Sequence, residues 1–129
     1  MAFEGSCHCG RVAFSVDDET PTKAVLCNCS RCRAKGFLVA YYPGEKFTLL
    51  RGEEELKSYR FNTHVIEHRF CGNCGVEPFA QASAPDGTPV KAINLRSVKS
   101  LDLDRLQLDF VDGANMPTGA RAAAEASFG

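Results

Sequence analysis

The chain alternates short apolar runs with turn-forming residues over most of its length, and this pattern predicts a β protein. In RVAFSV (11–16), every second side chain is large and apolar, so Val12, Phe14 and Val16 share one face of a half-buried strand. Runs rich in Val, Phe, Tyr and Leu, separated mostly by Gly, Pro, Asp or Asn, predict six further strands: KAVLC (23–27), FLVAYY (37–42), FTLL (47–50), KSYRF (57–61), IEHRF (66–70) and VKAINL (90–95). We therefore expect an all-β, or mainly β, fold.

Helical signals are few and short. SRCRAK (30–35) and GEEEL (52–56) each predict a brief helical turn, and PDGT (85–88) predicts a tight turn within a loop. The last residues are small and lack an apolar stripe, which is typical of a flexible tail. We expect one domain over residues 1–116 followed by a flexible C-terminal tail over residues 117–129.

Composition narrows the class of protein. A length of 129 residues suits one domain, and a net charge of -1 argues against a nucleic-acid partner, which needs a concentrated positive surface. No apolar run approaches the roughly 18 residues of a membrane helix. The N-terminus MAFEGSCHCG lacks the basic and apolar regions of a secretory signal, so we expect the protein in the reducing cytoplasm.

The chemistry lies in the seven cysteines, which fall into three clusters: Cys7 with Cys9, Cys27 with Cys29 and Cys32, and Cys71 with Cys74. An odd count without an export signal argues against disulfides. Closely spaced thiolates are soft donors that favour zinc or iron in tetrahedral sites. Glycines within or directly after the first and last clusters, at positions 10, 72 and 75, permit the sharp backbone of a metal knuckle.

The 2 + 3 + 2 arrangement suggests two different sites. The first and last pairs together supply four thiolates, a closed ligand set typical of structural zinc. The triplet Cys27, Cys29 and Cys32 supplies three thiolates and an open fourth position, as in a catalytic zinc site. Other partitions remain open, and one of His8, His64 or His68 could complete the triplet, because neutral imidazole also binds zinc.

Four residues outside the metal ligands are candidates for catalysis. His64 and His68 are four apart, so on a strand they share a face, and imidazole can act as a general acid or base near neutral pH. Either could instead be a hydrogen-bonded sheet histidine. Asn28 could hydrogen-bond a substrate beside the triplet, and Arg33 could meet a carboxylate. Our candidate catalytic residues are thus Cys29, His64, His68, Arg33 and Asn28.

The three cysteine blocks also resemble those of a known family. GSCHCGRVAF, CNCSRCR and FCGNCGVEPF are similar to the signature blocks of the GFA family, the relatives of glutathione-dependent formaldehyde-activating enzyme. The resemblance spans roughly residues 3 to 112. The second block has C-N-C where many members have C-H-C, and FNTHVIEHRFCGNCGV looks more like the centromere-protein-V-like branch.

The resemblance implies a β-tent of small sheets held by two zinc ions. Cys7, Cys9, Cys71 and Cys74 would bind the structural zinc, and Cys27, Cys29 and Cys32 a more labile zinc at the substrate site. It further implies a carbon–sulfur lyase that joins formaldehyde to the thiol of glutathione, giving S-hydroxymethylglutathione. Two alternatives without catalysis remain: a zinc-stabilised binding module, and a redox sensor in which oxidation of the triplet releases zinc. We expect no membrane partner, and the sequence leaves the oligomeric state open.

Overall fold

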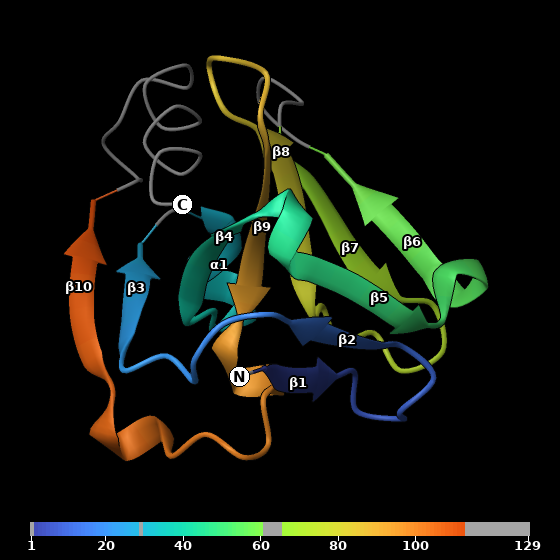
Figure 1. The fold of residues 1–129 in the computed structure, drawn as a ribbon, viewed down its shortest axis with the longest axis horizontal. Coiled ribbons are helices and arrows are strands. Elements are labelled where there is room, and N and C mark those ends of the chain that lie inside the picture. The colour runs from blue at the N-terminus through green and yellow to red at the C-terminus, as the bar shows by residue number, and fades with distance from the viewer. Residues whose placement is uncertain (1, 29, 61–65, 113–129) are drawn as a thin grey trace.

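A computed structural model gives the structure of residues 2–28, 30–60 and 66–112, with side chains described for all of these except residues 30–32. The described part is mainly β, as expected, and contains two sheets (Figure 1). The smaller sheet is antiparallel and has the order β1-β2-β5, with β1 at Phe3–Ser6, β2 at Ala13–Val16 and β5 at Phe47–Arg51.

The larger sheet has seven strands in the order β10-β3-β4-β9-β8-β7-β6. Its strands, in that order, are Gln107–Val111, Lys23–Cys27, Val39–Pro43, Pro89–Asn94, Phe79–Ser83, Glu67–Cys71 and Leu56–Tyr59. Strand β10 pairs in parallel with β3, and every other pairing is antiparallel. Figure 1 shows β1 and β2 crossing the larger sheet at a steep angle, with β10 and β6 at its two edges.

The helical elements are short, as the sequence predicts. Helix α1 spans Ser30–Lys35, and four 3-10 turns follow: η1 at Gly44–Lys46, η2 at Glu53–Glu55, η3 at Leu95–Ser97 and η4 at Leu103–Arg105. None of the helices in the part of the chain that the structure describes is long and apolar enough to cross a membrane. The predicted tail, residues 117–129, lies outside the described residues.

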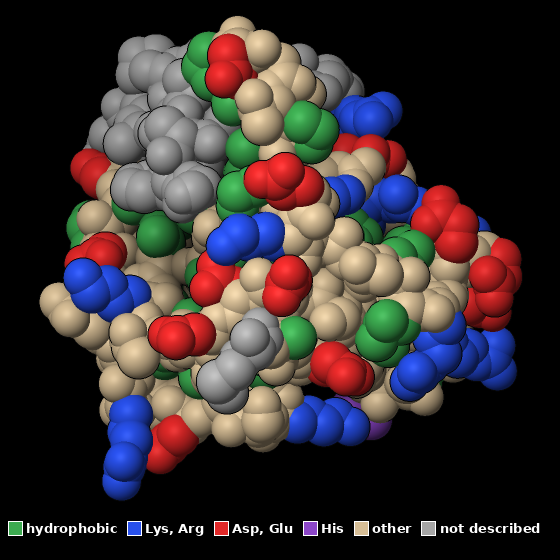
Figure 2. Space-filling view, in the orientation of Figure 1, with side chains coloured by type: hydrophobic (Ala, Val, Ile, Leu, Met, Phe, Trp, Pro, Cys, Tyr) green, Lys and Arg blue, Asp and Glu red, His purple; other side chains and the backbone are tan. Residues whose placement is uncertain are grey.

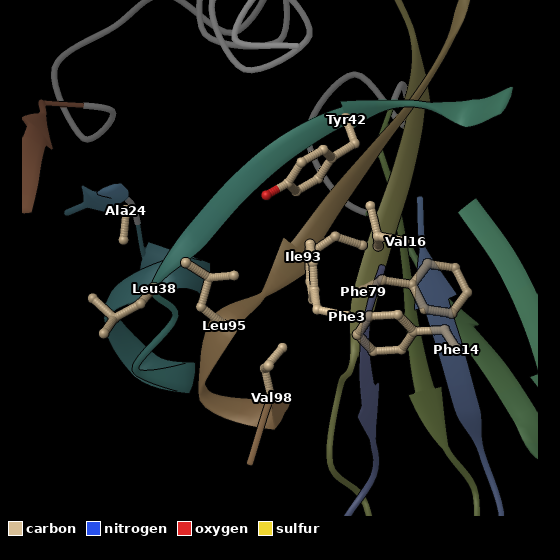
Figure 3. Packing of buried hydrophobic residues seen from close by; sticks show 10 residues of the cluster. All are labelled: Phe3, Phe14, Val16, Ala24, Leu38, Tyr42, Phe79, Ile93, Leu95 and Val98. Atoms are coloured by element: carbon tan, nitrogen blue, oxygen red, sulfur yellow. The ribbon is translucent and has the colours of Figure 1, made fainter. Parts of the chain in front are cut away.

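The core fills the space between the two sheets. The predicted apolar face of β2 is confirmed for Phe14 and Val16, which have no exposed surface and pack in the main core. Val12 is also fully buried, but it lies before β2 and packs with Cys7 and Cys71. The ring of Phe47 lies 5.6 Å from Phe14 on β2 and 4.6 Å from Phe79 on β8, between centroids. These aromatic contacts tie the small sheet to the large one. Figure 3 shows the buried side chains that surround them: Phe3, Phe14, Val16, Ala24, Leu38, Tyr42, Phe79, Ile93, Leu95 and Val98.

The opposite face of the larger sheet carries a second, smaller apolar cluster. Because side chains alternate along a strand, Ala24 of β3 points into the main core while Val25 and Cys27 do not. We call the second set the Cys27 cluster; its buried members are Val25, Cys27, Phe37, Val39 and Val111. The two faces of one sheet therefore serve different purposes, since one is filled by the main core and the other carries a cysteine of the predicted triplet.

Charged side chains of both signs are interspersed on the face of the molecule shown in Figure 2. Lys46 is paired with Asp18 at 3.1 Å, and Arg11 with Glu55 at 3.2 Å. This face therefore has no continuous basic surface among the residues that the structure describes. The mixture agrees with the near-neutral net charge of the chain.

Candidate functional site

Four cysteines from two distant segments converge at one end of the sheets. Cys7 and Cys9 lie in the loop after β1, Cys71 is the last residue of β7, and Cys74 lies in the turn that follows. Their four Sγ atoms all lie within 4.8 Å of one another. We call these four residues the clasp, and they are the two pairs that the sequence predicts as one site.

The geometry of the clasp fits a tetrahedral zinc ion. The Sγ atoms of Cys7 and Cys9 are 3.6 Å apart, and those of Cys9 and Cys71 are 3.7 Å apart. Zinc bound by sulfur at about 2.3 Å places tetrahedral ligands about 3.8 Å apart, whereas a disulfide bond is about 2.0 Å long. Four cysteines at this spacing, none of them in a disulfide, form a suitable donor set for one zinc ion.

The two halves of the clasp have nearly the same local backbone. The amide of Cys7 donates to the carbonyl of Val12 at 3.0 Å, and the amide of Cys71 donates to the carbonyl of Val76, also at 3.0 Å. Each loop then needs one left-handed residue, supplied by Gly10 with φ of 82° and Gly75 with φ of 81°. The predicted knuckle role of these two glycines is confirmed, because other residues adopt this conformation at a cost.

Hydrogen bonds and burial in the clasp favour a bound cation. The amide of Val12 donates to Sγ of Cys7 at 3.3 Å, and the amide of Asn73 donates to Sγ of Cys71 at 3.4 Å. The side chain of Asn73 also lowers the pKa of Cys9 to about 6. Burial raises the pKa of Cys7 to about 11, so this thiol becomes a thiolate at neutral pH only when a positive charge is close.

The second candidate region surrounds the end of β3. Cys27 is 4% exposed and packs in the Cys27 cluster, outside the clasp. The next residue, Asn28, donates its backbone amide to Val111 at 3.2 Å and its side-chain amide to Asp112 at 2.8 Å. These bonds hold the loop after β3 against the end of β10, directly before α1 begins. Asn28 is thus oriented by a carboxylate beside the predicted triplet.

Several predicted site residues cannot be located in this region. Cys29 and His64 lie outside the described residues, and Cys32 is described only as backbone of α1. The three-thiolate site therefore stays a prediction. Arg33 is exposed on α1, and its predicted contact with a carboxylate stays a prediction. His8 is exposed between two clasp cysteines.

His68 is the predicted catalytic residue with the most defined surroundings. Its Nδ1 lies 2.7 Å from Oε2 of Glu77, and both side chains are buried, with exposed fractions of 4% and 0%. The ring stacks on Phe37 of the Cys27 cluster at 6.3 Å between centroids, with an interplanar angle of 16°. Sequence reasoning missed Glu77. The sequence signal that could have identified Glu77 is a single carboxylate among mostly apolar residues in CGVEPF, directly after the Cys71–Cys74 pair.

Comparisons with known proteins identify the family of this chain. The profile of a family described as "Glutathione-dependent formaldehyde-activating enzyme", the GFA family, matches residues 2–105. A protein of Halomonas elongata that carries the provisional name of glutathione-dependent formaldehyde-activating enzyme is 33% identical over 107 aligned residues, covering 67% of this chain and 68% of the relative. A crystal structure of a Rhodobacter sphaeroides protein, a Northeast Structural Genomics target, superposes with a TM-score of 0.72 at 27% identity, covering 84% of this chain and 99% of the other. The chain therefore belongs to the GFA family.

Proposed function

We propose that this protein is a zinc-dependent carbon–sulfur lyase that forms and cleaves S-hydroxymethylglutathione, the adduct of formaldehyde and glutathione. Membership of the GFA family supports the class of reaction, and the relative from Halomonas elongata has a name that refers to the same chemistry. We propose further that it works as one domain, residues 1–116, in the cytoplasm, a reducing compartment in which cysteines such as Cys27 remain thiols.

The observation that carries the proposal is the division of the cysteines. Cys7, Cys9, Cys71 and Cys74 meet in the clasp, where four thiolates complete a tetrahedral shell. Cys27 lies in a different cluster, on the outer face of the larger sheet. This division supports the proposal that Cys27, Cys29 and Cys32 bind a second zinc whose fourth position can take the substrate.

A zinc ion at the triplet would supply a Lewis acid that binds the sulfur of glutathione or polarises the oxygen of formaldehyde. The protein contributes the surroundings. Asn28 is held by Asp112 beside the ligands, where its amide can orient the substrate. Arg33, exposed in the last turn of α1, can pair with a glutathione carboxylate. His68 lies on the same apolar face and can exchange a proton with the reacting oxygen.

The test combines metal analysis with a direct assay. We expect two zinc ions per chain, one of which a mild chelator removes. Magnetisation exchange between formaldehyde hydrate and S-hydroxymethylglutathione, followed by NMR, should be faster with the protein than without it. Cys29→Ala should lose this acceleration and one zinc, and keep the other zinc. An unaccelerated exchange with the fully loaded wild-type protein would overturn the proposed reaction, and a single tight zinc that Cys29→Ala leaves in place would overturn the second site.

A further inference from the structure

A small cavity lies on the outer face of the larger sheet, next to the Cys27 cluster. Its volume is about 30 Å³, and its lining includes Phe37, Val39, Tyr41, His68, Glu77 and Asn94. A cavity that holds one water needs about 10–15 Å³ measured in this way, so this one has room for roughly two non-hydrogen atoms. Most of the lining is apolar, and its polar side chains are those of Tyr41, His68, Glu77 and Asn94.

The cavity and the Cys27 cluster belong to one continuous surface. Phe37 and Val39 line the cavity and also pack in the Cys27 cluster. The sheet register brings His68 opposite Ala80, and Ala80 opposite Ala92, so His68 points to this same face. Helix α1 reaches it as well, because Nζ of Lys35 lies 6.0 Å from the ring centroid of Phe70, two residues after His68.

The contact between His68 and Glu77 restricts the state of the imidazole. If Glu77 is ionised, its carboxylate can only accept a hydrogen bond, and the 2.7 Å contact to Oε2 then requires a proton on Nδ1. In the neutral ring, Nε2 is then the basic nitrogen. The same bond also fixes the plane of the ring, which stacks on Phe37. A buried carboxylate that orients a histidine in this way also stabilises the ring when it becomes charged.

Glu77 is itself held from both sides. The side-chain amide of Asn94 donates to the carbonyl of Glu77 at 2.9 Å, and the backbone amide of Asn94 donates to the carbonyl of Pro78 at 3.0 Å. On the other side, the carbonyl of Val76 accepts from the amide of Cys71 in the clasp. The carboxylate is therefore mounted on a segment that the clasp and β9 both anchor, which is the rigidity a positioning group requires.

We propose that Glu77 is a positioning residue that holds His68 as the proton carrier for a one-carbon aldehyde bound in this cavity. The inference rests on the proposed lyase activity. Nε2 of His68 takes the proton of the glutathione thiol, the sulfur attacks the carbonyl carbon, and the electron pair of the carbon–oxygen double bond moves to oxygen. The protonated ring then returns the proton to that oxygen, so thiol and aldehyde give S-hydroxymethylglutathione with no other acid or base consumed. The size of the cavity restricts the aldehyde to formaldehyde.

The kinetic test is Glu77→Gln, which preserves the size of the side chain and removes its charge. We expect kcat of the NMR-monitored exchange to fall roughly 10- to 100-fold, with KM for glutathione changed less than about threefold and both zinc ions retained. Glu67→Gln is the matched control. Glu67 precedes His68 on β7, faces the opposite side of the sheet and is paired with Gln81 at 2.7 Å, so its loss should leave kcat unchanged.

A second measurement is made on the wild-type protein, so it does not depend on the folding of Glu77→Gln. Long-range proton–nitrogen NMR spectra of the wild-type protein, with His68 assigned by comparison with His68→Gln, should show the neutral ring protonated at Nδ1. A neutral ring protonated at Nε2, or a folded, zinc-loaded Glu77→Gln protein with wild-type kcat, would overturn the role of Glu77 while leaving the lyase proposal in place. A wild-type protein that does not accelerate the exchange would overturn the lyase proposal, and the role of Glu77 with it. Equal kcat/KM for acetaldehyde and formaldehyde would overturn the size restriction.

Discussion

The clasp and the Cys27 region use cysteines in opposite ways. In the clasp, the contact between Cys9 and Cys71 joins residues 62 positions apart, and each half is fixed by its own backbone hydrogen bonds. The predicted triplet, Cys27, Cys29 and Cys32, draws its ligands from six consecutive positions at the end of one strand and the start of one helix. The clasp closes a long loop and the triplet closes almost none. We therefore expect a metal in the clasp to contribute to folding, and a metal at the proposed second site to contribute mainly to chemistry.

The difference can be expressed as chain entropy. Tying together two points some 60 residues apart removes about 4 kcal/mol of conformational freedom from the unfolded chain. A ligand set within six residues restricts a loop that is already short, and its entropic contribution is correspondingly smaller. Stability should therefore depend strongly on the clasp and weakly on the triplet.

The largest expected effect comes from breaking the clasp. Cys71→Ser should lose the structural zinc and, with it, most of the free energy of unfolding, because binding of a structural metal is coupled to folding. Cys32→Ser, the same change at the other site, should lower zinc content by one ion and leave the urea midpoint close to wild type. Urea titration and metal analysis of both purified proteins measure this contrast. Similar midpoints for the two variants would contradict the division of roles.

A smaller loss in the free energy of unfolding is expected at Gly52, where the backbone packs closely against the loop that carries Cys7 and Cys9. Gly52 has φ of 97°, and a Cβ there would lie 2.4 Å from the carbonyl oxygen of Arg11 and 2.7 Å from Cα of Val12, next to the first knuckle. Gly52→Ala should therefore combine left-handed strain with a backbone clash and cost about 3 kcal/mol of stability.

Gly87 is the matched control for that variant. Its φ is 89°, but a Cβ there would meet no atom within 4 Å. Gly87→Ala should therefore show the strain alone, about 1 kcal/mol. Chemical denaturation of the two variants separates the cost of the left-handed conformation from the cost of the backbone clash. Equal losses in the free energy of unfolding would show that the backbone near Arg11 can move away from the new Cβ at little cost.

The smallest effect is expected at the loop after β3. Asp112→Ala removes the carboxylate that accepts from Asn28 at 2.8 Å, and this should cost about 1 kcal/mol of stability. The clasp should keep its zinc, while the more weakly held zinc should be lost at a lower chelator concentration, because the loop that carries its ligands is less fixed. A chelator titration followed with a zinc-sensitive dye checks this, and an unchanged titration would mean that Asn28 does not support the second site.

The sequence predicted seven of the ten strands that the structure describes and the position of α1. The predicted strands contain β-branched, aromatic or leucine side chains, whose preference for a pleated surface is local. Strand β8, FAQAS, has little such preference and forms because β7 and β9 flank it on both sides. Strand β10 pairs in parallel with β3. Its sequence LQLDFV (106–111) does alternate apolar and polar residues, so a local signal for this strand was present and was missed. For β8, no comparable local pattern was available.

At the candidate site, features encoded by local motifs were predicted from the sequence, and contacts between distant residues were not. Paired cysteines with adjacent glycines led directly to the clasp, because each half is built from local geometry. The contact between His68 and Glu77 was missed, since it arises from the turn between β7 and β8 and from the clamp that Asn94 provides. A carboxylate nine positions after a histidine has no meaning until the fold brings the two together.

The parallel pairing of β10 with β3 has a consequence for biosynthesis. Val111, at the end of β10, lies opposite Cys27, so this edge of the sheet stays incomplete until nearly all of the described chain has been made. The clasp needs only the residues up to Cys74. Because a chain emerges from its N-terminus, all four clasp cysteines are available before β8, β9 and β10 have been made, so the clasp can close before the β3–β10 edge of the sheet is complete.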